Sequence, residues 1–191
     1  MAVYFNLAID CDQDENSAKE LTRIFHEFKI PTERFGELTC RSEHIPPKRY
    51  WGFTWHKQRG KLGPPSEYAG DWHKVCVSPS EMSMSFKPEY RGILDEPNMN
   101  HVRNELYERL KYGLSLGHQF RSAAFGCEFQ DLLGEIEWLD DLEAINQTGK
   151  LPRYTEGLIL NADWVKNDSA KDQLEHFADG YLWWNAPSRG H

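Results

Sequence analysis

Residues 3–28 read VYFNLAIDCDQDENSAKELTRIFHEF, and this stretch decides how the chain begins to fold. Apolar side chains occupy every second position of its first seven residues, which is the period of a β-strand. A polar turn with aspartates follows, and the next apolar residues recur at helical spacing. Ser17 and Glu20 have the spacing of a capping box, and Pro31 prevents the helix from continuing. We therefore predict a strand and then a helix whose buried face contains Ala18, Leu21, Ile24, Phe25 and Phe28.

The same two periods predict the later elements. Pro97 suits the first turn of a helix, and an apolar stripe runs on through residues 99–114. Glu135 to Ile145 predicts another helix, which Thr148-Gly149 can end. The predicted strands are Tyr50–Lys57, Trp72–Ser78, Glu81–Phe86, Phe120–Cys127, Gly157–Leu160 and Tyr181–Trp184. Together these elements predict an α+β protein, a single domain over residues 1–191 with a mostly antiparallel or mixed sheet packed against about three helices.

Composition limits the class of protein. A chain of 191 residues with 39% hydrophobic and 13% aromatic residues can form a core without metal or disulfide support. It contains no run of eighteen apolar residues and starts without a basic leader, so we expect no membrane segment. The four cysteines are widely spaced, which favours reduced thiols and a cytoplasmic location.

Negative charge is concentrated in the last third of the chain. Residues 122–191 hold 13 acidic and 5 basic residues, which accounts for the whole net charge of −8. Residues 128–143 alone contain seven carboxylates and no Lys or Arg. The field of the molecule is therefore centred on this acidic segment.

On the predicted helix, the acidic side chains fall on the side opposite the apolar residues. Like charges without basic neighbours at i,i+4 repel one another and lower helix stability, which favours a binding role. Such a field speeds association with basic partners, the mode of bacterial immunity proteins and phage-encoded inhibitors. We predict a non-catalytic acidic binding protein that neutralises a basic partner such as a toxin or nuclease. The same pattern is typical of a solvated helix face, and that interpretation stays open. The predicted partner-binding residues are Glu135, Glu137, Trp138, Asp140, Asp141, Glu143, Trp183 and Trp184.

An alternative is a metal-dependent hydrolase or phosphotransferase that uses Asp10 and Asp12. Carboxylates at alternate positions after a strand can converge on a divalent cation. The pair loosely resembles the strand-end Asp-x-Asp of haloacid-dehalogenase-like phosphotransferases, although Asp14 stands where that family has a small Thr or Val. An EF-hand loop would need Gly in place of Glu15 and Glu in place of Leu21. No phosphate loop, nucleophile elbow or zinc spacing occurs, so we predict no catalytic residues, metal or cofactor.

A second alternative is single-stranded nucleic-acid binding by residues 48–61. This segment alternates basic and aromatic residues, which suits base stacking together with phosphate contacts. Its Arg49, Trp51, Phe53 and Trp55 partly resemble the RNA-contacting strand of an RNA-recognition motif. The net charge of −8 opposes binding of a polyanion, so a protein partner is favoured.

Overall fold

The computed structural model describes residues 5–32, 36–46, 71–79, 96–127, 136–152 and 155–185. Its eight strands form one sheet in the order β2-β3-β4-β1-β5-β6-β8-β7, and every neighbouring pair is antiparallel. This confirms the predicted α+β class and the antiparallel sheet. The strands are β1 (Phe5–Asp10), β2 (Phe28–Thr32), β3 (Gly36–Ile45), β4 (Trp72–Pro79), β5 (Ser122–Cys127), β6 (Gly157–Asn161), β7 (Glu175–Ala178) and β8 (Tyr181–Asn185).

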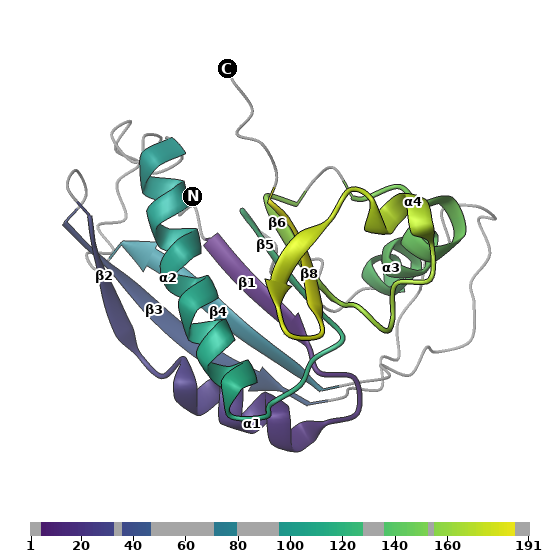
Figure 1. Cartoon of the computed structure of the whole chain (residues 1–191). Coiled ribbons are helices and arrows are strands. Elements are labelled where there is room, and N and C mark those ends of the chain that lie inside the picture. The colour runs from purple at the N-terminus through teal and green to yellow at the C-terminus, as the bar shows by residue number, and fades with distance from the viewer. Residues whose placement is uncertain are drawn as a thin grey trace, which may run out of the picture.

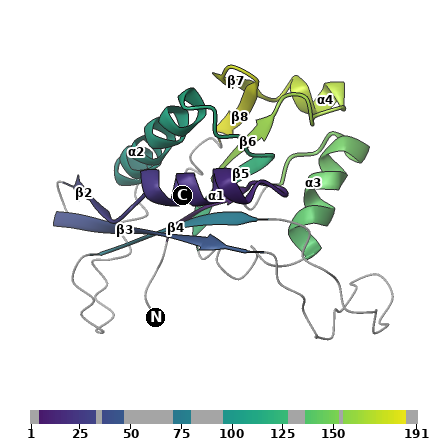
Figure 2. The same cartoon turned by 90° about the horizontal axis from the view of Figure 1, so that it is seen from below.

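Three of the described helices have ten or more residues, and a fourth is a single turn. α1 and α2 lie side by side on one face of the sheet, whereas α3 and α4 lie together beside β6 and β8 (Figures 1 and 2). In the described part of the chain, no helix has the length and apolar character needed to span a membrane. The helices are α1 (Glu15–Ile24), α2 (Glu96–Ser115), α3 (Ile136–Thr148) and α4 (Asp168–Lys171).

Alternation along the central strand divides the core into two parts. Leu7 and Ile9 of β1 belong to the hydrophobic cluster under α1 and α2. Ala8, between them in sequence, belongs to a second cluster that includes Leu142 and Ile145 of α3. Because successive side chains of a strand point to opposite faces, the two clusters lie on opposite sides of the sheet. We call these the α1/α2 face and the α3 face.

The start of α1 differs from the predicted capping box. Asp14 is the N-cap residue, and its carboxylate accepts hydrogen bonds from the Ser17 backbone N–H at 2.9 Å and hydroxyl at 2.7 Å. Aspartate is among the best N-cap residues, because its carboxylate accepts a free N–H of the first turn and opposes the helix dipole. Ser17 therefore lies inside the helix, and the expectation that it begins the helix together with Glu20 was wrong.

The predicted end of α1 was also wrong. The helix stops at Ile24, and Phe28 begins β2, where it pairs with Cys40 of β3. Pro31 lies within β2, which is an outermost strand of the sheet. An outer strand tolerates proline because one of its sides needs no N–H donors. Pairing with β3 therefore overrides the helical spacing of the apolar residues.

Most of the other predicted elements are present. The predicted strands at residues 72–78, 120–127, 157–160 and 181–184 correspond to β4, β5, β6 and β8, and the two later helices correspond to α2 and α3. Gly149 follows α3 with φ of 71°, a left-handed conformation that ends the helix at Thr148 as expected. The sequence did not predict β2, β3, β7 or α4, and the predicted strands Tyr50–Lys57 and Glu81–Phe86 lie outside the described residues.

Candidate functional site

The acidic residues predicted to bind a partner lie on or next to α3. Glu143 is exposed on this helix. Four more predicted residues belong to its backbone, with side chains outside the described part, and Glu135 lies outside the described residues altogether. The four on the helix are Glu137, Trp138, Asp140 and Asp141.

The C-terminal half of α3 is fixed to the rest of the molecule. Leu142 and Ile145 are 1% and 0% exposed in the hydrophobic cluster of the α3 face. The Asn146 amide donates to the Trp164 carbonyl at 3.1 Å and accepts from the Lys166 backbone N–H at 2.7 Å. These contacts hold both the buried side and the C-terminal end of α3 in place. The exposed Glu143 side chain is therefore attached to a helix whose position is fixed.

The two predicted aromatic anchors lie on different faces of the sheet. Trp184 packs against the cluster that contains the buried residues of α3. Trp183 packs on the α1/α2 face, with its ring centroid 5.5 Å from that of Tyr107 and 5.6 Å from that of Phe177. Both tryptophans are partly buried. Only Trp184 is on the same side of the sheet as α3.

Asp10 is fully buried in an ion pair that links the end of β1 to the start of β5. Its Oδ2 accepts from Arg121 Nε at 2.8 Å and lies 2.6 Å from Arg121 Nη2, while Oδ1 accepts from the Asp12 backbone N–H at 2.9 Å. Burial raises the pKa of the Asp10 carboxyl above its usual value, and the Arg121 guanidinium opposes that rise. Both oxygens of Asp10 are therefore engaged by protein donors.

The three aspartates at and after the end of β1 do not converge on one point. The Asp12 side chain is 57% exposed and its Oδ1 lies 3.5 Å from Arg121 Nη1, whereas Asp14 binds Ser17 at the start of α1. The hydrogen bonds from Ser17 lower the pKa of the Asp14 carboxyl. Among the described residues, no group of three or more His, Cys, Asp or Glu side chains is placed to hold a metal ion.

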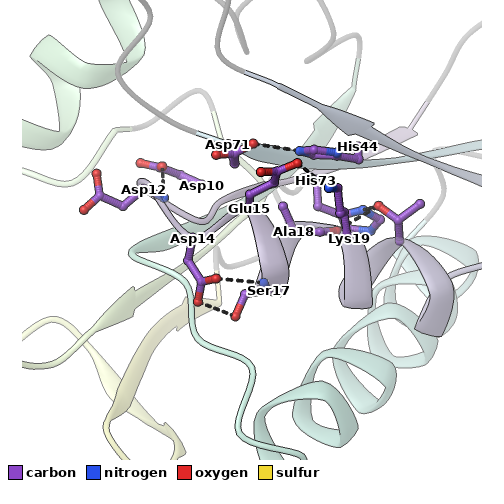
Figure 3. A network of polar contacts seen from close by, with 11 residues as sticks. Asp10, Asp12, Asp14, Glu15, Ser17, Ala18, Lys19, His44, Asp71 and His73 are labelled. Carbon is purple, nitrogen blue, oxygen red and sulfur yellow. Dashed lines mark hydrogen bonds and ion pairs between the residues drawn. The ribbon is translucent and has the colours of Figure 1, made fainter.

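A second polar network, which the sequence did not predict, lies beside α1 (Figure 3). His44 of β3 and His73 of β4 are paired across the two strands. His44 Nε2 lies 2.8 Å from Asp71 Oδ1, and His73 Nδ1 lies 2.9 Å from the Thr22 hydroxyl of α1. Two backbone hydrogen bonds fix Asp71 to the loop after β1. The Asp71 carbonyl accepts from the Cys11 N–H, and the Asp71 N–H donates to the Asp12 carbonyl. The sequence alone could have indicated this network only if the register of β3 and β4, which pairs His44 with His73, had been known.

Arg49, Trp51, Phe53 and Trp55, the residues predicted to contact nucleic acid, lie outside the described residues, as does the whole segment 48–61. Comparisons of the chain with protein-family models, with curated proteins and with solved structures found no match.

Proposed function

We propose that this protein is a non-catalytic binding protein of the inhibitor or immunity type, and that the acidic side of α3 binds a basic protein such as a toxin or nuclease. The observation that carries the proposal is the attachment of α3. Leu142, Ile145 and Asn146 hold the helix on the sheet, while Glu143 on the same segment is exposed. A charged surface on a fixed helix loses little conformational entropy when it binds.

The charge of α3 supports a basic partner. The helix contains two aspartates and two glutamates and no lysine or arginine. Clustered exposed carboxylates attract a cationic surface over about 8–10 Å at physiological ionic strength. They therefore raise the rate of association more than they lengthen the lifetime of the complex.

The test uses a partner captured from the host lysate at low salt, released by high salt and then purified. Its association rate is measured by stopped-flow fluorescence against the wild-type protein and against the double variant Asp140→Lys, Glu143→Lys. We expect the double variant to associate at least about tenfold more slowly and to show a weaker dependence on salt.

A matched control separates α3 from net charge. Glu105 of α2 and Glu175 of β7 are both exposed, so the double variant Glu105→Lys, Glu175→Lys changes net charge by the same amount. We expect this control to associate within about twofold of wild type at physiological salt, where distant charges are screened. Equal slowing in both double variants, or no slowing in either, would contradict a role for α3.

The alternative functions receive no comparable support. A metal ion at Asp10 and Asp12 would have to compete with the Arg121 guanidinium and the Asp12 N–H for the Asp10 carboxylate. Titration with Mg²⁺, Mn²⁺ and Ca²⁺ in a calorimeter tests this alternative. Heat of binding in the wild-type protein that is lost in Asp12→Asn would support it.

Nucleic-acid binding by residues 48–61 is tested by the anisotropy of a fluorescent oligonucleotide at low salt.

A further inference from the structure

The hydrogen bonds around Thr22 place a hydrogen on Nδ1 of His73. Thr22 Oγ1 lies 2.9 Å from the Ala18 carbonyl, and because a carbonyl only accepts, the hydroxyl hydrogen is used there. The hydroxyl oxygen must then accept from His73 Nδ1, 2.9 Å away. Nδ1 of His73 therefore carries a hydrogen, and in the neutral ring Nε2 has a bare lone pair.

Protonation of that lone pair would place a charge in an unsuitable environment. His73 is 0% exposed, and its Nε2 has no hydrogen-bond partner within the part of the chain that the structure describes. The ring packs against Phe25 of α1, with ring centroids 5.3 Å apart. Burial lowers the pKa of His73 to about 3, and positive charge on His44 acts in the same direction.

Within the described part of the chain, the elements next to His73 offer the imidazolium no free counter-charge. Asp71, the residue just before β4, is already bound to His44, the cross-strand partner of His73. Glu15 and Lys19, the charged residues of α1 near His44, pair with each other. The β1 side contributes Ile9, which is opposite His73 in the strand pairing, and then Cys11, whose thiol has a pKa raised by burial.

Thr22 also makes a second polar contact between the end of α1 and the sheet. Besides the contact with β4 through His73, its backbone carbonyl accepts from the Ser42 hydroxyl of β3 at 2.9 Å. We propose that the His73–Thr22 contact is an acid-sensitive latch: uptake of a proton by His73 releases α1 from the sheet while the rest of the fold persists. This device is independent of the partner surface proposed for α3.

Native-state hydrogen exchange of the full-length protein tests the latch. The probe is the Phe25 amide, which donates to the Leu21 carbonyl at 2.9 Å, and the reference is the Gly149 amide, which donates to Ile145 at 2.8 Å. Protection factors are corrected for the intrinsic pH dependence of exchange. Uptake of one proton on opening, at the ordinary histidine pKa of about 6.5, predicts a fall of about thirtyfold at Phe25 between pH 7.5 and 5.0. Protection of Gly149 is expected to fall by less than about threefold, because its opening does not expose His73.

Variants assign the effect to one ring. His73→Asn keeps an N–H donor near the position of Nδ1 but cannot titrate, so the pH dependence at Phe25 should disappear. His26→Asn is the matched control, because His26 is exposed just after the same helix, and it should keep the thirtyfold change. An unchanged pH dependence in His73→Asn would overturn the proposal, and so would a parallel fall at Phe25 and Gly149, which would indicate global unfolding.

A measurement on the wild-type protein covers the case in which His73→Asn fails to fold. Nitrogen NMR of the histidine rings distinguishes the two neutral tautomers and the imidazolium. We expect His73 to be neutral at pH 5.0 with its hydrogen on Nδ1. A neutral ring with its hydrogen on Nε2 only, or a cationic ring at a pH where the Phe25 amide is still protected, would refute the latch.

Discussion

Gly157 provides a sharp test of packing, because it opens β6 directly against Tyr107 of α2. A methyl group at Gly157 would lie 2.0 Å from Tyr107 Oη and 3.3 Å from Cζ. The tyrosine ring meets Phe177 and Trp183 edge to face, with centroids 5.7 and 5.5 Å away, so it cannot move without disturbing both. We expect Gly157→Ala to lower the free energy of unfolding by about 3 kcal/mol, the upper end of the usual cost of overpacking.

The hydroxyl of Tyr107 is the atom responsible, and it can be removed separately. It is buried and has no hydrogen-bond partner among the described residues, so Tyr107→Phe removes a polar atom that gains nothing in the folded state. We expect Tyr107→Phe to change the free energy of unfolding by less than about 1 kcal/mol. In that background, Gly157→Ala should cost less than about 1 kcal/mol, because the nearest remaining atom is Cζ at 3.3 Å.

Equilibrium unfolding in urea, followed by tryptophan fluorescence, measures all four proteins of this double-mutant cycle. The expected coupling energy is about 2 kcal/mol, with m-values unchanged. The reasoning is refuted if Gly157→Ala costs the same in both backgrounds within about 0.5 kcal/mol.

Two further predictions concern the aspartates at and after the end of β1. Arg121→Met leaves the Asp10 carboxylate buried without its counter-charge and should lower the free energy of unfolding by about 3 kcal/mol at pH 7. Because burial already raises the pKa of Asp10, this loss of stability should shrink as the pH falls toward 4 and Asp10 takes up a proton. Thermal unfolding of both proteins at pH 7 and pH 4.5 measures the difference. Asp14→Ala should cost about 1 kcal/mol, whereas Asp14→Asn retains most of the cap. The hydrogen bonds from Ser17 lower the pKa of Asp14, so the charge-dependent stabilisation by the cap is present above the ordinary pKa of 3.8 and is lost as the pH falls through the lower pKa of the folded state. A difference in stability between wild type and Asp14→Ala that grows on acidification would contradict this.

Local periodicity predicted the parts of the fold that carry a regular pattern. β1 has large apolar residues at every second position, and the buried residues Val102, Leu106 and Leu110 of α2 repeat every four positions. α3 was also predictable, because Leu142 and Ile145 fall on one side of a helix that glycine ends. In these segments the local preference and the tertiary structure agree.

The remaining features depend on contacts between residues distant in sequence. Asp10 and Arg121 are 111 residues apart, and His44 meets His73 only through the register of β3 and β4. Phe28 fits the apolar face of a helix, but pairing with β3 draws it into β2. No periodicity within one segment contains this information, so the sequence indicated the carboxylates but neither the basic partner of Asp10 nor the histidine network.

The strand order has a consequence for how the chain folds. β1 precedes the other described strands in the chain, yet it lies between β4 and β5, so its first neighbour is complete only at residue 79 and its second only at residue 127. Before β4 is made, both edges of β1 lack their partner strands, and Leu7 and Ile9 lack the neighbouring strands of their cluster. The long loops between β1 and its partner strands must close before the hydrogen bonds at the centre of the sheet can form, and this slows folding. The apolar side of β1 therefore stays uncovered until long after this strand has been synthesised, which leaves it open to non-native contacts during synthesis.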